Sequence, residues 1–207
     1  MVRRFKMIVI TVALVIGPVP LAACGSSSGR STALKTYMNS QFGFSLQYDS
    51  RLSESSGATA QALPGVGASA VFNIGFLDAK RTTADGKHAD GIFVAVSQLG
   101  NPGIREQVSK LRSQLKANIV IFASAIRVSS LSPVASATVN GTSGFRLAYT
   151  YESGATKLRA TTYFLIKASR EYELTIQSAA DEWSELQPLI QKTVSSFTVQ
   201  EPPLLAT

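Results

Sequence analysis

The strongest constraint on the fold is a succession of four short segments in which apolar and polar residues alternate, with very short connections between them. Such alternation is typical of half-buried β-strands, because successive side chains point to opposite faces of a sheet. Parallel neighbours would need crossovers of a dozen or more residues, so an antiparallel meander is predicted. Asn140-Gly141 is a strong turn signal between the first two segments. The segments are 134–139, 145–151, 158–166 and 171–177.

The rest of the chain predicts two helices and three further strands. Asn101-Pro102 marks the start of the first helix, because asparagine caps helices well and proline is tolerated in the first turn. Residues 119–122 either extend this helix or open a strand. The second helix begins near Asp181 and shows apolar residues at three- and four-residue steps. A long irregular connection is expected over 51–69. The predicted strands are 44–48, 71–77 and 92–98.

Three groups of residues, taken in order, resemble the Mog1/PsbP-like family, whose fold many bacterial envelope lipoproteins use. The resemblance covers Tyr37 to Val199 and departs from the family at Asp49, where a proline is common after the first strand. The matching groups are Phe42-Gly43-Phe44-Ser-Leu46-Gln-Tyr48, then Val139-Asn-Gly141 followed by 145–151, and finally Trp183 with Ser195-Ser196-Phe197-Thr-Val199.

The resemblance implies an α+β fold, in which an antiparallel β-sheet is flanked by helices as a Mog1/PsbP-like α/β/α sandwich. It implies no shared reaction, because members are mostly binding or assembly accessories and a fold alone does not determine function.

The start of the chain has the pattern of an export signal. Arg3, Arg4 and Lys6 form a cationic end, and an apolar run over 7–16 follows. This run is too short to cross a bilayer. Helix-breaking prolines follow it, which argues against a retained membrane span.

Leu21, Ala22, Ala23 and Cys24 resemble the lipobox of bacterial lipoproteins. The resemblance implies cleavage before Cys24, lipid attachment to its sulfur, and a place at the extracytoplasmic face of a bacterial cell membrane. Two or three acyl chains anchor a protein stably where one would not. Two alternatives stay open, namely an ordinary secretory signal with a chance cysteine and an uncleaved anchor.

These observations predict one folded domain. Removal of the signal peptide, 1–23, from the 207-residue chain leaves 184 residues, which suffice for one domain and are tight for two. The lipidated cysteine and a serine- and glycine-rich flexible tether occupy 24–36. A single Mog1/PsbP-like domain follows over 37–199, and 200–207 form a loose tail.

The distribution of charge argues against nucleic acid as a partner. The three cations of the signal leave 17 of the 20 Lys and Arg against 13 Asp and Glu, so the mature net charge is +4. No basic cluster is interleaved with aromatic residues, and nucleic-acid binding is therefore not expected. The surplus permits attraction to anionic lipid without requiring it.

The chain lacks a recognisable catalytic or metal-binding set. His88 is the only histidine and is expected in a solvated loop, while Cys24 is the only cysteine. Asp78, Asp85 and Asp90 do not have the spacing of a calcium loop, and neighbouring cations would repel a metal ion. No enzyme activity, metal or cofactor is predicted.

Glu171 and Glu173 are one residue apart in a predicted strand and share a face. Paired carboxylates can cleave glycosidic bonds, but the expectation for this pair is that it faces water. The stretch 141–144 is expected to be a hairpin turn and not a catalytic loop.

A binding surface is suggested by aromatic and cationic residues of the meander. Tyr149, Tyr151 and Tyr163 lie on two of its strands, and the favoured interpretation is a packed core with hydroxyl groups at its rim. The alternative is that some of them line a groove for a lipid tail or a glycan, and that Lys157 and Arg159 contact anionic lipid or a partner.

Two functional hypotheses follow. The first is a non-enzymatic envelope lipoprotein that binds another envelope protein or assists assembly of a complex. The second is a lipid or glycolipid carrier with an internal apolar cavity. In both, the acylated Cys24 holds the protein to the membrane.

Overall fold

The computed structural model describes residues 33–58, 70–84, 86–99, 112–113, 116–119 and 127–200. All of them belong to one compact unit, Thr32–Thr207. The predicted signal peptide, the lipobox and residues 201–207 of the predicted C-terminal tail lie outside the described residues, and so does the helix start predicted at Asn101-Pro102.

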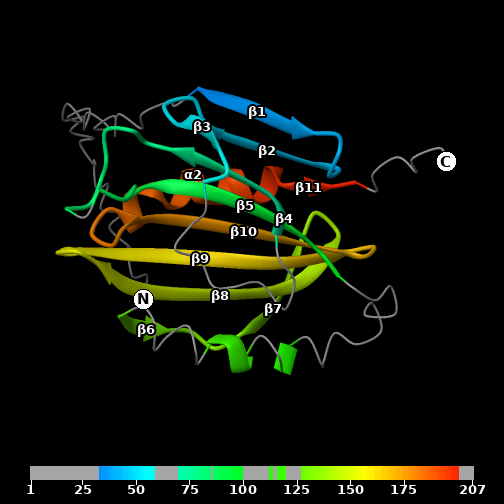
Figure 1. Ribbon diagram of the computed structural model, residues 1–207. Helices are drawn as coiled ribbons and strands as arrows, with labels where there is room; N and C mark the ends of the chain where they lie inside the picture. Colours follow the sequence, from blue (N-terminus) through cyan, green and yellow to red (C-terminus); the bar gives the residue numbers. More distant parts are fainter. Residues whose placement is uncertain are drawn as a thin grey trace, which may run out of the picture. The chain divides into compact units, whose positions relative to one another are not determined.

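The described strands form two antiparallel sheets (Figure 1). The small sheet has the order β1-β2-β11, and the large sheet has the order β3-β4-β5-β10-β9-β8-β6, with β7 also paired to β8. The bounds are β1 Leu34–Asn39, β2 Phe44–Asp49, β3 Ser53–Ser56, β4 Ala70–Leu77, β5 Gly91–Gln98, β6 Val128–Leu131, β7 Ala135–Val139, β8 Thr142–Ser153, β9 Thr156–Lys167, β10 Arg170–Ala179 and β11 Thr198–Val199.

The predicted meander is confirmed. Strands β7, β8, β9 and β10 pair antiparallel in chain order, with Phe145 opposite Phe164 and Thr162 opposite Thr175. The first hairpin turns at Asn140 and Gly141, which have φ values of 44° and 78°. Asparagine and glycine are the residues that best tolerate this left-handed backbone. The strands predicted at 44–48, 71–77 and 92–98 are β2, β4 and β5.

Three strands differ from the prediction. Strand β1 begins at Leu34, so 34–36 are folded and not part of the tether. Strand β3 lies within the connection predicted over 51–69 and pairs with β4. Strand β6 was not predicted. These strands carry mostly exposed side chains. Backbone pairing with a neighbour holds them in place, and that pairing leaves no hydrophobic pattern in the sequence.

The first hydrophobic core fills the space between the two sheets. Phe44 of β2 contacts Phe197 with ring centroids 5.9 Å apart, and Tyr48 contacts Phe76 of β4 at 4.4 Å. Helix α2, Trp183–Ser196, lies against β2 and β10 and leads directly into β11 (Figure 1). Helix α2 starts two residues after the predicted position. The small sheet and α2 therefore cover one face of the large sheet.

A second core lies on the opposite face of the large sheet. Ile119 packs there beside the buried side chains of β8 and β9. Residues 112–113 and 116–119 are helical, so residue 119 extends the helix. The predicted sandwich is confirmed in part. The sheets are antiparallel and two helices are present, but a second sheet shares the covering of one face with α2.

Asp49 ends β2 at the position where the sequence departs from the family. Its carboxylate is 1% exposed and accepts hydrogen bonds from the Arg51 backbone N–H, at 2.9 Å, and from the Arg51 side chain. Burial would raise the pKa of Asp49, but the hydrogen bonds and charge of Arg51 lower it overall. A paired carboxylate therefore turns the chain where the family commonly has proline.

Candidate functional site

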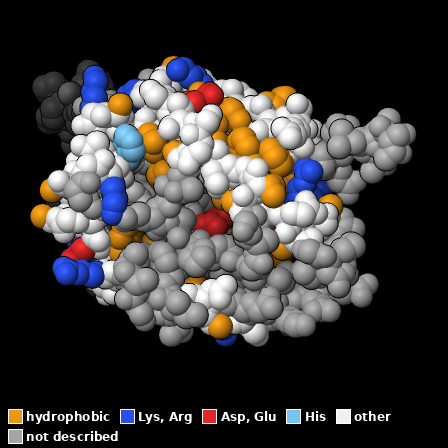
Figure 2. Space-filling model, viewed as in Figure 1, with side chains coloured by type: hydrophobic (Ala, Val, Ile, Leu, Met, Phe, Trp, Pro, Cys, Tyr) orange, Lys and Arg blue, Asp and Glu red, His pale blue; other side chains and the backbone are white. Residues whose placement is uncertain are grey.

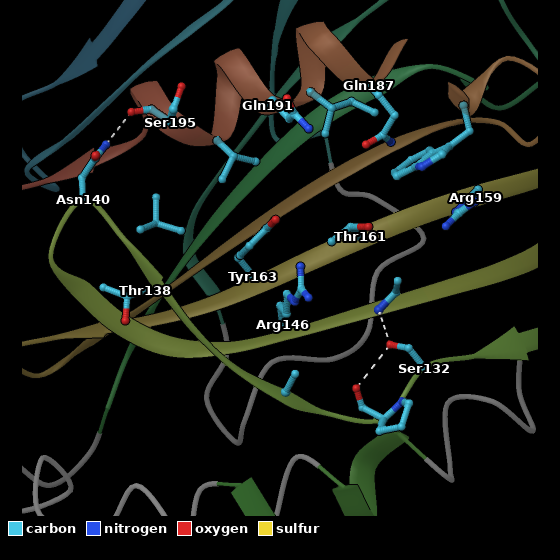
Figure 3. A pocket seen from close by; sticks show the side chains of 17 residues that line it. Ser132, Thr138, Asn140, Arg146, Arg159, Thr161, Tyr163, Gln187, Gln191 and Ser195 are labelled. Carbon is cyan, nitrogen blue, oxygen red and sulfur yellow. Dashed lines mark hydrogen bonds between the residues drawn. The ribbon is translucent and has the colours of Figure 1, made fainter. Parts of the chain in front are cut away.

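A groove of about 860 Å³ lies between α2 and the β7–β8–β9 part of the large sheet (Figure 3). We call it the α2 groove. Its floor consists of side chains from β8 and β9, its upper wall is α2, and its lower rim is formed by β7 and the residues before it. The floor residues are Arg146, Ala148, Arg159, Thr161 and Tyr163.

Strand register explains why these floor residues share a face. Arg146 lies opposite Tyr163, and Ala148 lies opposite Thr161. Side chains alternate between faces along a strand, so the intervening residues, such as Leu147, point into the second core. The floor of the groove is thus the part of the large sheet face that the small sheet does not cover.

Helix α2 presents a mixed polar and apolar wall to the groove. Gln187, Gln191 and Ser195 recur at four-residue steps, which places them on one side of the helix. Ile190 and Val194 also line the groove while packing against the first core. The wall therefore presents amide and hydroxyl groups beside the apolar side chains of Ile190 and Val194.

Hydrogen bonds hold the two ends of the groove. At one end the Asn140 side-chain amide donates to the backbone carbonyls of Ser195 and Phe197, at 2.7 and 2.9 Å. This ties the β7–β8 turn to the end of α2. At the other end the Ala148 backbone N–H donates to the Ser132 hydroxyl oxygen, at 2.8 Å. Figure 3 shows the bond between Asn140 and Ser195 and the bond that ends at Ser132.

The lining of the groove is cationic. The described residues that line it include Arg146 and Arg159 and no Asp or Glu. The ion pairs among the described residues involve Arg51 and Arg81, so neither groove arginine has a carboxylate partner there. The Arg159 guanidinium lies 5.1 Å from the centre of the Trp183 ring, which is a favourable cation–π distance.

Comparisons with known proteins identify the family. The family model for PsbP matches residues 32–199. The chain belongs to the PsbP family. The predicted Mog1/PsbP-like resemblance is therefore confirmed. No curated protein matches the chain.

Solved structures share the fold of this PsbP-family chain. The solution structure of cyanobacterial PsbP (CyanoP) from Synechocystis sp. PCC 6803 has a TM-score of 0.51 at 14% identity, covering 88% of this chain and 100% of that one. A crystal structure from Bacteroides thetaiotaomicron VPI-5482 has a TM-score of 0.50 at 8% identity, covering 81% of this chain and 48% of that one. LpqN, involved in cell envelope biogenesis of Mycobacterium tuberculosis, has a TM-score of 0.47 at 11% identity, covering 84% and 87%.

The PsbP-family fold separates the predicted binding residues. Tyr163 and Arg159 lie in the α2 groove, and Lys157 is exposed on the same strand but is not among the groove residues. Tyr149 and Tyr151 are 2% and 1% exposed and belong to the second core. Their burial agrees with the favoured interpretation of a packed core, and Tyr151 also lines a smaller cavity of about 380 Å³ on that face. They point to the face opposite the groove because of strand alternation.

Arg146, Asn140 and the polar residues of α2 were not predicted as site residues. Two signals were available. Arg146 stands between apolar neighbours in an alternating strand, which marks it as pointing away from the second core. Gln187 and Gln191, four residues apart, predict a polar side on the closing helix. Neither signal says that the two surfaces face each other.

The carboxylates of Glu171 and Glu173 contradict the expectation that they face water. They are 2% and 6% exposed, because β10 is a central strand that is covered on both faces. Burial, and then the charge of Glu171, raise the pKa of Glu173 from 4.5 to about 8. The Thr175 hydroxyl donates to Glu173 Oε1 at 3.5 Å and partly offsets this rise.

The loop between β4 and β5 carries His88 and the aspartates considered for a cation. His88 is half-buried, not fully solvated as expected, and its Nδ1 lies 3.4 Å from the Asp78 carbonyl oxygen. Asp90 forms an ion pair with Arg81, with Nε and Oδ2 3.0 Å apart. Asp85 lies outside the described residues. Within the described part of the chain, no three His, Cys, Asp or Glu residues are grouped as metal ligands would be.

Lys and Arg side chains are scattered around the margin of the face shown in Figure 2 and do not gather into one patch there.

Among the helices of the described ranges, none has the length and apolar character needed to cross a membrane.

Proposed function

We propose that this PsbP-family chain is a non-enzymatic binding protein of the bacterial envelope. In this proposal the acylated Cys24 holds the domain at the extracytoplasmic face of the membrane. The domain binds another envelope protein, or assists assembly of a complex, through the α2 groove. The observation that carries the proposal is the groove itself, which is open, cationic and lined by both polar and apolar side chains.

The side chains of the α2 groove support a protein partner. Arginine, tyrosine and tryptophan are the residues most enriched among those that dominate binding energy in protein interfaces. The groove brings together Arg146, Arg159 and Tyr163, with Trp183 beneath the Arg159 guanidinium. The hydrogen bond from the Asn140 side-chain amide to the Ser195 carbonyl at the end of α2 supports a preformed groove, which reduces the entropy cost of binding.

The N-terminal sequence supports the anchor. Leu21, Ala22, Ala23 and Cys24 match a lipobox, and β1 begins at Leu34. Only nine residues, 25–33, separate Cys24 from β1. We infer that the groove is presented close to the membrane surface, where envelope partners are concentrated.

Replacement of the lipobox cysteine is expected to release the protein. Cys24→Ser removes the sulfur that accepts the lipid, so the variant should lose palmitate labelling and move from the membrane fraction to the soluble fraction. Ser27→Ala, a change three residues away, is the matched control and should stay in the membrane. A Cys24→Ser protein that still incorporates palmitate would exclude this anchor.

Photo-crosslinking in living cells tests the groove. A photoreactive residue at the exposed Gln191 position is expected to capture one reproducible protein, and the same residue at the exposed Lys35 position of β1 should not. Equal capture from both positions, or no protein from Gln191, would contradict the proposal. Lipid recovered from Gln191 without any protein would favour the lipid or glycolipid carrier instead.

A further inference from the structure

The floor of the α2 groove carries two arginines at well separated positions. Arg146 and Arg159 are both exposed, and both line the groove. Arg159 lies opposite Thr150, which is four residues beyond Arg146 on β8. At about 3.4 Å per residue, the two backbone positions are roughly 14 Å apart along the strands. The groove therefore holds two distinct positive charges and not a single cluster.

Both guanidinium groups are available to an anionic ligand. Among the described residues, neither one forms an ion pair with a carboxylate. The Arg159 guanidinium lies over the Trp183 ring. A guanidinium in that position still presents N–H groups in its own plane, and these match the two oxygens of a carboxylate. Carboxylates are therefore ligands that both arginines can bind.

The groove is neutral and partly apolar between the two arginines. On its floor Ala148 lies opposite Thr161 (Figure 3). On its wall Ile190 and Val194 are half-buried, so part of each side chain remains open to a ligand. A ligand that covers these side chains gains from the removal of apolar surface from water. The lining therefore favours a ligand with apolar groups between two negative charges.

We propose that the α2 groove binds an acidic segment of the partner protein, in which Asp or Glu residues flank apolar residues. One carboxylate pairs with Arg146 and a second pairs with Arg159. The apolar residues between them pack against Ile190 and Val194. The inference rests on the proposed function and specifies the chemistry of the partner.

The shape and lining of the groove favour a polypeptide over other anions. The floor lies between α2 and the rim formed by β7, so a flat bilayer surface would meet these two edges first. A polypeptide segment can enter the groove along its length. An anionic polysaccharide would satisfy the arginines, but it carries no apolar side chains to pack against Ile190 and Val194.

Peptide binding to the full chain in detergent micelles tests the proposal. Two fluorescent peptides carry a pair of aspartates with apolar residues between them. In one the aspartates are four residues apart, which spans about 14 Å in an extended chain, and in the other eight, which spans about 12 Å in a helix. Fluorescence anisotropy should show that at least one peptide binds about tenfold or more tightly than its asparagine version.

The double variant Arg146→Gln/Arg159→Gln should weaken binding of that peptide by about tenfold or more, because charge-assisted hydrogen bonds are lost. Lys35→Gln is the matched control. It removes an exposed cation of β1 outside the groove and should change affinity less than about twofold. If neither aspartate peptide binds better than its asparagine version, the proposal is overturned.

Exchange of the charges separates direct pairing from damage to the fold. The variant Arg146→Glu/Arg159→Glu should lose binding of the aspartate peptide and gain binding of a version with lysines in place of the aspartates. A variant that has lost its structure would bind neither peptide. A folded variant, as shown by circular dichroism, that still prefers the aspartate peptide would exclude pairing with these arginines.

Crosslinking from Gln191 distinguishes this inference from the proposed function. Mass spectrometry of the captured protein should place the crosslink in a segment with acidic residues on both sides of apolar ones, and Arg146→Gln/Arg159→Gln should reduce capture about tenfold or more. If the segment is not acidic, or the double variant leaves capture unchanged, the inference fails while the proposed function stands. Capture of no protein would overturn both.

Other anions give a different result. Binding of polygalacturonate, or of micelles that contain phosphatidylglycerol, could depend on the arginines while the aspartate peptides bind no better than their asparagine versions. That outcome would overturn the inference and assign the groove to an anionic glycan or lipid.

Discussion

Glu173→Gln is expected to stabilise the folded protein by roughly 4 kcal/mol at pH 8 and to have little effect at pH 5. Burial, together with the charge of Glu171, raises the pKa of Glu173 from 4.5 to about 8. Glutamine has nearly the shape of the protonated acid but does not titrate. The variant therefore removes a pH-dependent penalty of folding and preserves the packing.

The sign of this effect follows from proton linkage. Between pH 4.5 and about 8 the folded state holds a proton on Glu173 that the unfolded state has already released. The free energy of unfolding therefore falls as pH rises through this window, and it stops falling above the folded pKa. The wild-type protein should be most stable near the acidic end of the window, as far as this group contributes.

Urea unfolding of both proteins at pH values across this window measures the effect. Glu152→Gln is the matched control, because Glu152 is exposed on strand β8 of the same sheet. The control should leave the pH dependence of the wild type unchanged. Parallel curves for wild type and Glu173→Gln would show that Glu173 ionises normally in the folded state.

Gly144→Ala is expected to destabilise the fold by about 3 kcal/mol or more. A Cβ atom at Gly144 would lie 1.9 Å from the Phe164 carbonyl oxygen and 2.9 Å from the Leu165 Cα. Both atoms belong to the backbone of β9, in which Leu165 lies directly opposite Gly144. Relief of the clash therefore requires β8 and β9 to separate, which breaks hydrogen bonds in the centre of the meander.

Thermal and urea unfolding measure this cost, and Ser143→Ala is the matched control at the adjacent exposed position. The control should change stability by less than about 0.5 kcal/mol. Circular dichroism of Gly144→Ala shows whether the variant folds at all, and failure to fold is consistent with the prediction. A variant as stable as the wild type would show that the two strands accommodate the methyl group.

The meander and the second core were predictable because they depend on patterns within a few consecutive residues. Alternation over 145–151 predicts a strand, and burial of Leu147 and Tyr149 on one face follows from it. The turn at Asn140 and Gly141 needs only the backbone preferences of those two residues. The family could be recognised because such local patterns recur in a set order.

The edge strands and the buried carboxylates were not predictable from these patterns. Strand β3 is polar and exists because β4 offers it backbone partners. Glu173 has the sequence signature of a water-facing residue, and it is buried because β10 lies between β5 and β9 with both faces covered. The residues that adjoin Glu173 in the sequence do not show whether its strand is covered on one face or on both.

Local sequence thus determined the strands of the meander, the closing helix and the core residues of the meander, since each depends on periodicity within a short window. The α2 groove arose from the fold, because Arg146, Arg159 and Gln191 come from three elements that meet only when α2 packs beside the sheet. These side chains line one site only because α2 packs beside the sheet. That packing depends on the burial of other residues in the first core.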